Sequence, residues 1–223
     1  MEMTQEYLLD LINRMNTKDD ARTSDLSVSW QAHREAEAIS DPSAFPWLYG
    51  IVEANPGKKA GDVRDNAYFI IGKLLKNSFD REACEFLIQR LEVEDNKYVL
   101  SRMLDRITEL TLPTEMDITP IVACSKSEKW LVRHSALCAL GALATKQSRE
   151  ALAFYLEQDD EKQYRDEMIY ANASLGRIGC AEDIPLIEKH LHSRSPAIRD
   201  SARFALERIG HGGDLQALNT MPK

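Results

Sequence analysis

The sequence predicts an all-α fold, a right-handed α-α superhelix (α-solenoid) of about five helical hairpins with an N-terminal helical cap. Three observations support this prediction. Amphipathic helical patterns recur along the chain at intervals of 31 to 36 residues, and a fixed period of that length is typical of solenoids. Turn-forming residues such as Asn55, Pro56 and Gly57 separate the helical segments. No segment alternates between apolar and polar residues for long enough to predict a strand.

The repeat is clearest in the second helix of each hairpin. The triplet Arg-Ile-Gly at residues 208–210 repeats the triplet at 177–179, 31 residues earlier. Residues 63–72 and 132–141 both open with Val-Arg and place an alanine four residues after the valine. Further copies are predicted at residues 98–107, 164–179 and 198–210. The alanine lets adjacent helices approach closely, so that larger apolar side chains interdigitate.

A shorter amphipathic helix precedes each of these second helices. The predicted first helices are residues 41–54, 80–91, 114–125, 147–157 and 181–192. Several have start signals, because Asp41 stands before Pro42 and Asp80 opens its segment. Thr114 is followed by Glu115, whose carboxylate suits the first turn of a helix. Three prolines fall inside these segments and are expected to kink their helices: Pro46, Pro120 and Pro185.

The predicted organisation is one structural domain in three parts. Residues 1–40 form an N-terminal helical cap, with one helix at 4–15 and another at 30–39 around a polar loop. Residues 41–210 form the hairpins, and residues 211–223 form a C-terminal cap or tail. A cap is expected because the first hairpin of a stack would otherwise leave an apolar face exposed.

Composition excludes several classes of protein. The net charge is -8, which argues against a general nucleic-acid binder, since such proteins need a cationic field to displace counterions from phosphates. No apolar stretch approaches the roughly 20 residues needed to span a bilayer, and the first residues do not resemble a secretory signal. The expectation is a cytoplasmic protein without a membrane segment, and the sequence leaves its oligomeric state open.

Neither a metal site nor a cofactor site is predicted. None of the four cysteines forms a Cys-x-x-Cys pair, so reduced, buried thiols are expected. His190 and His192 are two residues apart and face opposite sides of a helix. They could hold a metal only with local fraying and a third ligand such as His211. A surface role is predicted for both histidines.

Two segments, residues 132–141 and 183–210, resemble a known family of helical repeats. The pattern Val-Arg-x-x-Ala-x-x-Ala-Leu-Gly at residues 132–141 is similar to the second helix of a HEAT repeat in its short bacterial-type form, and residues 183–210 resemble a whole repeat. The resemblance covers residues 41–210 and is weaker at 80–110. It implies an armadillo-like helical stack with the second helices along its concave side. It also implies that the arginine near the start of the second helix meets acidic groups of the next repeat, a place that fits Arg64, Arg133, Arg165 and Arg199.

The predicted function is that of a non-enzymatic HEAT-repeat scaffold or adaptor that binds a protein partner on its concave surface. The planar guanidinium group of arginine can bind a carboxylate through two hydrogen bonds, so an acidic peptide is a plausible ligand for this surface. The candidate partner-binding residues are Arg102, Arg106, Arg133, His134, Tyr170, Arg199 and Arg203. For Arg133 and Arg199 the competing role is the inter-repeat ladder.

The sequence is also compatible with other hypotheses for the function. One is an acidic immunity or inhibitor protein that blocks a basic toxin, which suits the net charge. Two more follow from the resemblance alone, since some DNA glycosylases and bilin lyases also use HEAT-like repeats. The sequence contains no catalytic motif, but a catalytic site assembled in space by distant residues cannot be read from residue order.

Overall fold

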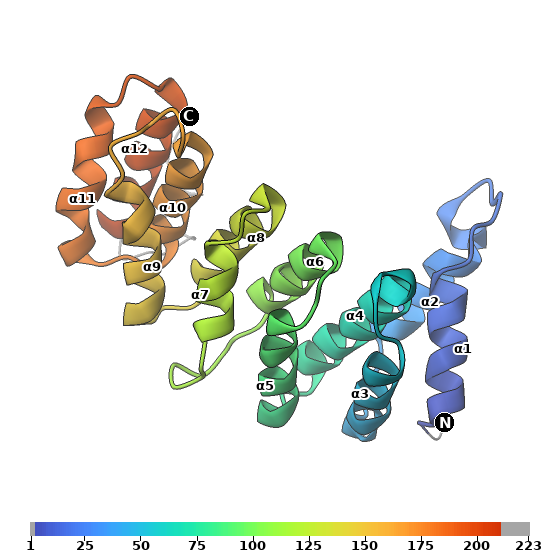
Figure 1. Cartoon of the computed structure of the whole chain (residues 1–223). Coiled ribbons are helices and arrows are strands. Elements are labelled where there is room, and N and C mark those ends of the chain that lie inside the picture. The colour runs from blue at the N-terminus through green and yellow to red at the C-terminus, as the bar shows by residue number, and fades with distance from the viewer. Residues whose placement is uncertain (1–2, 211–223) are drawn as a thin grey trace. The chain divides into compact units, whose positions relative to one another are not determined.

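The computed structural model describes residues 3–210, and within that range every regular element is a helix. This confirms the predicted all-α class. The chain divides into two compact units, Met1–Leu110 and Thr111–Lys223. Both consist of short helices joined by turns and loops (Figure 1). The predicted C-terminal cap or tail, residues 211–223, lies outside the described residues.

The first unit contains six α-helices and four short 3-10 turns among its described residues. The α-helices are α1 (Gln5–Met15), α2 (Val28–Glu37), α3 (Phe45–Ala54), α4 (Gly61–Asn77), α5 (Arg81–Gln89) and α6 (Lys97–Thr108). The 3-10 turns are η1 (Ser24–Leu26), η2 (Pro42–Ala44), η3 (Lys58–Ala60) and η4 (Arg90–Glu92). Helix α1 packs against α2, α3 and α4, and α4 also packs against α5 and α6. The predicted hairpin α3–α4 is therefore present, with the α1–α2 pair beside it, and both α5 and α6 pack against α4.

The second unit contains six α-helices and two 3-10 turns among its described residues. The α-helices are α7 (Thr119–Ser125), α8 (Trp130–Leu140), α9 (Lys146–Leu156), α10 (Arg165–Ile178), α11 (Ile184–Glu188) and α12 (Pro196–Gly210). The 3-10 turns are η5 (Ala181–Asp183) and η6 (Lys189–His192). Helix α10 packs against both α8 and α12, so the second helices of the three hairpins lie in chain order.

The repeated alanines lie where the second helices meet. Ala67, Ala136, Ala171 and Ala202 have no exposed surface. Helices α10 and α12 approach closely, since a Cβ added at Gly176 would lie 2.9 Å from the Cα of Ala205. A small residue is required at that point because the backbone of the neighbouring helix occupies the space that a side chain would need.

Most first helices begin at the predicted signals, with one difference. The Asp80 carboxylate accepts a hydrogen bond from the amide of Ala83 at 2.8 Å and caps α5. The predicted start at Thr114 is wrong, because α7 begins only at Thr119. The Asp117 carboxylate accepts the amide of Thr119 at 2.9 Å. With proline in the first turn, this later signal starts the helix instead of Thr114.

The three prolines of the first helices do not kink them. Pro46, Pro120 and Pro185 each lie in the first turn of an α-helix, in α3, α7 and α11. Their missing N–H groups would have no intrahelical partner at that position, so the helix loses no hydrogen bond. The predicted kinks are therefore wrong, and the prolines mark helix starts.

Only one of the two histidines, His190 and His192, lies at the surface as predicted. His192 is exposed, but His190 is buried and its Nε2 lies 2.9 Å from the carbonyl oxygen of Leu156. Helix α11 gives way to η6 at this point, and a 3-10 helix rotates each residue further than an α-helix does. His211 lies outside the described residues.

Among residues 3–210 no three His, Cys, Asp or Glu side chains are grouped as a metal ion would require. Of the four cysteines, Cys84 and Cys124 are buried and Cys138 and Cys180 are half-buried. In the same range no helix has both the length and the apolar character needed to cross a bilayer.

Candidate functional site

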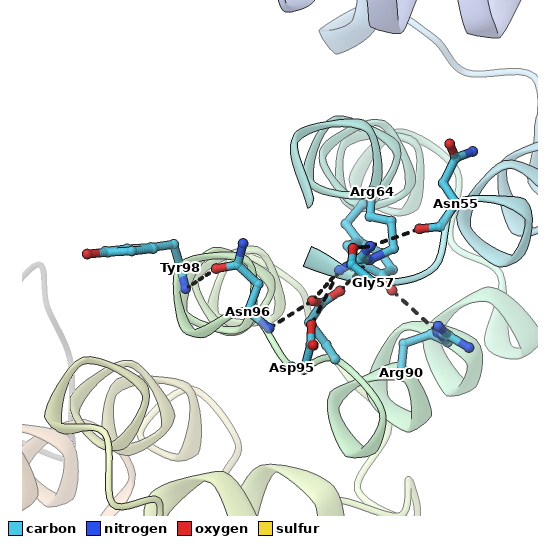
Figure 2. Close-up of polar contacts among 9 residues, drawn as sticks. Asn55, Gly57, Arg64, Arg90, Asp95, Asn96 and Tyr98 are labelled. Carbon is cyan, nitrogen blue, oxygen red and sulfur yellow. Dashed lines mark hydrogen bonds and ion pairs between the residues drawn. The ribbon is translucent and has the colours of Figure 1, made fainter. Parts of the chain in front are cut away.

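In the first unit Arg64, near the start of α4, ties three segments together. Its Nε and Nη2 donate to the two carboxylate oxygens of Glu94 at 2.8 and 2.6 Å. Its Nη1 donates to the carbonyl oxygens of Asn55 and Gly57 at 2.8 and 2.5 Å, as Figure 2 shows. The side chains of Arg64 and Glu94 are 4% and 0% exposed. The pair is therefore a buried structural clasp between the turn before α4 and the chain that leads into α6.

The second unit repeats this clasp with Arg133 of α8. Its Nε and Nη2 donate to one carboxylate oxygen of Glu167 at 2.8 and 2.5 Å, and its Nη1 donates to the carbonyl oxygen of Ser127 at 2.8 Å. The Glu167 side chain, on α10, is 5% exposed. Burial alone would raise the pKa of Glu167, but the hydrogen bonds that its carboxylate accepts from Arg133 and from the backbone, with the positive charge of Arg133, leave that pKa below its ordinary value.

The other two arginines that the family resemblance placed in the ladder behave differently. Arg165 is the first residue of α10 and is largely exposed, and it pairs with the adjacent Asp166 at 3.3 Å. The predicted contact of Arg165 with an acidic group of the next repeat is wrong. The guanidinium pairs instead with Asp166 of its own helix. Arg199 donates through Nη1 to the carbonyl oxygens of Ser193 and Arg194 at 2.7 and 3.1 Å. It thus holds its own turn as Arg133 does, and it makes no ion pair within residues 3–210.

An aromatic stack stands beside the Arg133–Glu167 clasp. The rings of Trp130 and His134 lie 5.6 Å apart at 57°, and those of His134 and Tyr170 lie 4.6 Å apart at 26°. Trp130 and His134 share a face because they are four residues apart on α8, while Tyr170 comes from α10. Trp130 is 62% exposed and Tyr170 is 37% exposed. A large apolar surface is therefore presented to solvent by two packed second helices.

The stack lines an open hollow of about 780 Å³ within the second unit. The residues around it are Trp130, Arg133, His134, Lys162, Gln163, Arg165, Asp166, Glu167, Ile169 and Tyr170. The Nε2 atom of His134 is buried, makes no hydrogen bond within the described residues, and lies 3.4 Å from a carboxylate oxygen of Glu167. The hollow is thus lined both by the Arg133–Glu167 ion pair and by aromatic rings.

Two of the predicted binding residues, Arg102 and Arg106, lie on α6 in the first unit. Arg102 forms an ion pair with Asp65 of α4 at 3.0 Å. The guanidinium of Arg106 lies 4.8 Å from the ring centre of Phe69, and its Nε is buried without a hydrogen-bond partner in the described residues. Burial raises the pKa of Asp65, although Arg102 and Arg106 act in the opposite direction. These two arginines are engaged mainly with the neighbouring α4.

The structure brings together Arg133, His134 and Tyr170, three of the seven predicted binding residues. Arg199 and Arg203 lie on α12 and do not line the hollow. Arg203 is exposed and pairs with Asp200, three residues earlier on the same helix, at 2.9 Å. Within the second unit, three of the five candidate residues therefore line one hollow and two do not.

Trp130 and Glu167 complete the site and were not among the predicted residues. The four-residue spacing between Trp130 and His134 was a usable signal, since residues so spaced share a helix face. Glu167 gave a weaker signal, because its contact with Arg133 joins the second helices of two consecutive hairpins, with α9 between them in the chain. An alignment of the repeats that also compared their acidic residues would have identified Glu167.

Comparison with known proteins shows the fold but no family. No protein-family model and no curated protein matches this sequence. A crystal structure of an engineered protein is similar, with a TM-score of 0.51 and 18% identity over 93% of this chain and 98% of that one. A designed armadillo repeat protein in complex with the peptide (KR)4 has a TM-score of 0.51 and 15% identity over 91% and 99%. The likeness shows an armadillo-like helical repeat fold.

Proposed function

We propose that this chain is a non-enzymatic scaffold or adaptor of HEAT-like repeats that binds a segment of a partner protein on the second helices of its second unit. The observation that carries the proposal is the exposed Trp130–His134–Tyr170 stack above the Arg133–Glu167 clasp. Tryptophan, tyrosine and arginine are the residues most enriched at binding hot spots. In this proposal α1 and α2, within residues 1–40, are the N-terminal cap.

The architecture of the site suits a peptide better than a small metabolite. The hollow is open along α8 and α10, and its walls mix exposed aromatic rings with exposed charges. Such a surface can contact several side chains of an extended segment while the clasp keeps the helices fixed. A protein of similar fold, the designed armadillo repeat protein, is itself in complex with a peptide, which supports a peptide as the class of ligand.

A selection from a displayed random peptide library tests this proposal with the full chain. Selected peptides should bind the purified protein, and Trp130→Ala should weaken that binding by about tenfold or more, as expected for the loss of a hot-spot tryptophan. The matched control is Trp47→Ala in the first unit, which removes another exposed tryptophan and should leave binding unchanged. Selection of no peptide, or equal loss in both variants, would show that the stack is not a binding site.

A further inference from the structure

The hollow beside the aromatic stack adjoins a second one in the same unit, because three residues line both. This second hollow has a volume of about 350 Å³ and also opens to solvent. Arg133, Gln163 and Glu167 line both hollows. The Arg133–Glu167 clasp therefore borders both hollows, and we call the two adjoining hollows the groove.

Both ends of this groove offer aromatic surface. The Trp130–His134–Tyr170 stack lines one end. Phe154, which is 42% exposed, lines the other end, and the ammonium group of Lys126 lies 5.6 Å from the centre of its ring. Two separated aromatic surfaces can each accept a bulky side chain, so the groove suits a chain segment with two such residues rather than a single ring.

The charges of the groove are opposite in sign to the charge of the whole chain. Four cationic side chains and three carboxylates line the two hollows, which leaves one excess positive charge in a chain of net charge -8. Within this set Arg133 is satisfied by Glu167, and Arg165 pairs with Asp166. Lys162 is exposed at the rim and makes no ion pair within residues 3–210.

Lys162 and Arg165 are the cations best placed to contact a ligand. They stand three residues apart where the chain enters α10, and both are exposed beside the aromatic stack. The carboxylate that faces Arg165 is a surface group, so a ligand carboxylate can compete for the guanidinium at little cost. The carboxylate of Glu167, by contrast, is 5% exposed and already engaged, so a basic ligand finds only Asp166 and Glu128 available along the groove.

We infer that the groove recognises an acidic segment of a partner protein in which a carboxylate lies between two bulky apolar or aromatic side chains. The carboxylate meets Lys162 and Arg165. One apolar side chain packs on Trp130 and Tyr170, and the other packs on Phe154. This inference rests on the proposed function, and it fixes the sign of charge and the side-chain pattern of the segment.

Synthetic fluorescent peptides test the inference on the full chain by fluorescence anisotropy. The first peptide carries aspartates between two aromatic residues, the second replaces the aspartates by lysines, the third replaces the aromatics by serines, and the fourth is (KR)4. The first peptide should bind at least about tenfold more tightly than each of the others, and its affinity should fall as salt is added.

A second experiment reverses the charges of the two exposed cations, Lys162 and Arg165. Lys162→Glu with Arg165→Glu should weaken the first peptide by about tenfold or more, and both positions are exposed, so the fold should persist. The control reverses two exposed lysines of the first unit, Lys58→Glu with Lys59→Glu, and should leave the affinity unchanged. Circular dichroism confirms that each variant is helical.

The possible results separate the two proposals. Tighter binding of the lysine peptide or of (KR)4, or an affinity that the rim variant leaves unchanged, would overturn the acidic-segment inference while leaving peptide binding intact. If the library selection yields ligands that need Trp130 but lack acidic residues, the inference fails and the proposed function stands. If neither the synthetic nor the selected peptides bind, both fail.

Discussion

Arg133 and Glu167 are 34 residues apart in the chain, and two nitrogens of the guanidinium meet one oxygen of the carboxylate at 2.8 and 2.5 Å. In the first unit Arg64 and Glu94, 30 residues apart, form a similar pair in which one guanidinium nitrogen donates to each carboxylate oxygen. In both cases the arginine lies near the start of a second helix and also holds a carbonyl of the preceding turn. The clasp is thus a repeated structural device, and in the second unit its two residues also line the candidate groove.

Removal of one partner of the buried clasp should destabilise the protein strongly. Glu94→Leu leaves the Arg64 guanidinium buried without its carboxylate, which is expected to lower the free energy of unfolding by about 3–5 kcal/mol. Urea denaturation followed by circular dichroism measures the change. The double variant Arg64→Met with Glu94→Leu should recover much of the loss, and a double variant as unstable as the single one would contradict this account.

Acid should weaken the second unit through Glu167. Its pKa in the folded state lies below the ordinary value, so the stability that it contributes is complete above the pKa of the unfolded chain, about 4.3, and is lost as the pH falls through the lower folded value. Unfolding free energies measured at pH 7 and at successively lower pH should fall less steeply in Glu167→Gln than in the native chain. The exposed Glu157→Gln is the control, and an unchanged slope in Glu167→Gln would refute the argument.

The cysteines should differ sharply in reactivity. Burial raises the pKa of Cys84 to about 12 and that of Cys124 to about 11, so neither forms appreciable thiolate near neutral pH. A thiol reagent added to the native protein should therefore modify only Cys138 and Cys180, which are half-buried. All four should react in denaturant. Rapid native labelling of Cys84, detected by peptide mass spectrometry, would contradict its burial.

Two glycine substitutions should have opposite effects. In Gly176→Ala the new methyl group would lie 2.9 Å from the Cα of Ala205, so α10 and α12 must separate and stability should fall by about 1–3 kcal/mol. In Gly50→Ala, within α3, the methyl group meets no atom within 4 Å, and the better helix propensity should stabilise the chain by about 0.5–1 kcal/mol. Thermal unfolding compares the two, and equal shifts would show that the close helix contact is absent.

The hairpins could be predicted because the signals for them are local. The spacing of buried side chains in a helix, the Asp80 cap and the turn at Gly57 are each contained in a few neighbouring residues, and Gly57 has the positive φ of 77° that glycine readily adopts. The predicted start of α7 was wrong because two nearby signals for a helix start competed. Thr114 resembled a helix start, but Asp117 and the proline that follows provided a better one.

The candidate site was only partly predictable, because it depends on which residues of different helices face one another. The spacing of Trp130 and His134 fixes their shared helix face, whereas the ring of Tyr170 reaches them only through the packing of α8 on α10. His190 was misplaced for a similar reason, since the change from α-helix to 3-10 helix alters which face it occupies. Sequence patterns give helix faces, but they do not give the contacts between helices.

The arginines that hold the turn of their own hairpin set a limit on loop length. Arg64 reaches the carbonyls of Asn55 and Gly57, and Arg133 reaches that of Ser127, each from within the first turns of the following helix. An inserted residue in such a turn would move these carbonyls out of reach and leave a guanidinium with unmade hydrogen bonds. Insertions and deletions among relatives of this chain should therefore collect in other loops, and the turn inside each clasped hairpin should keep its length.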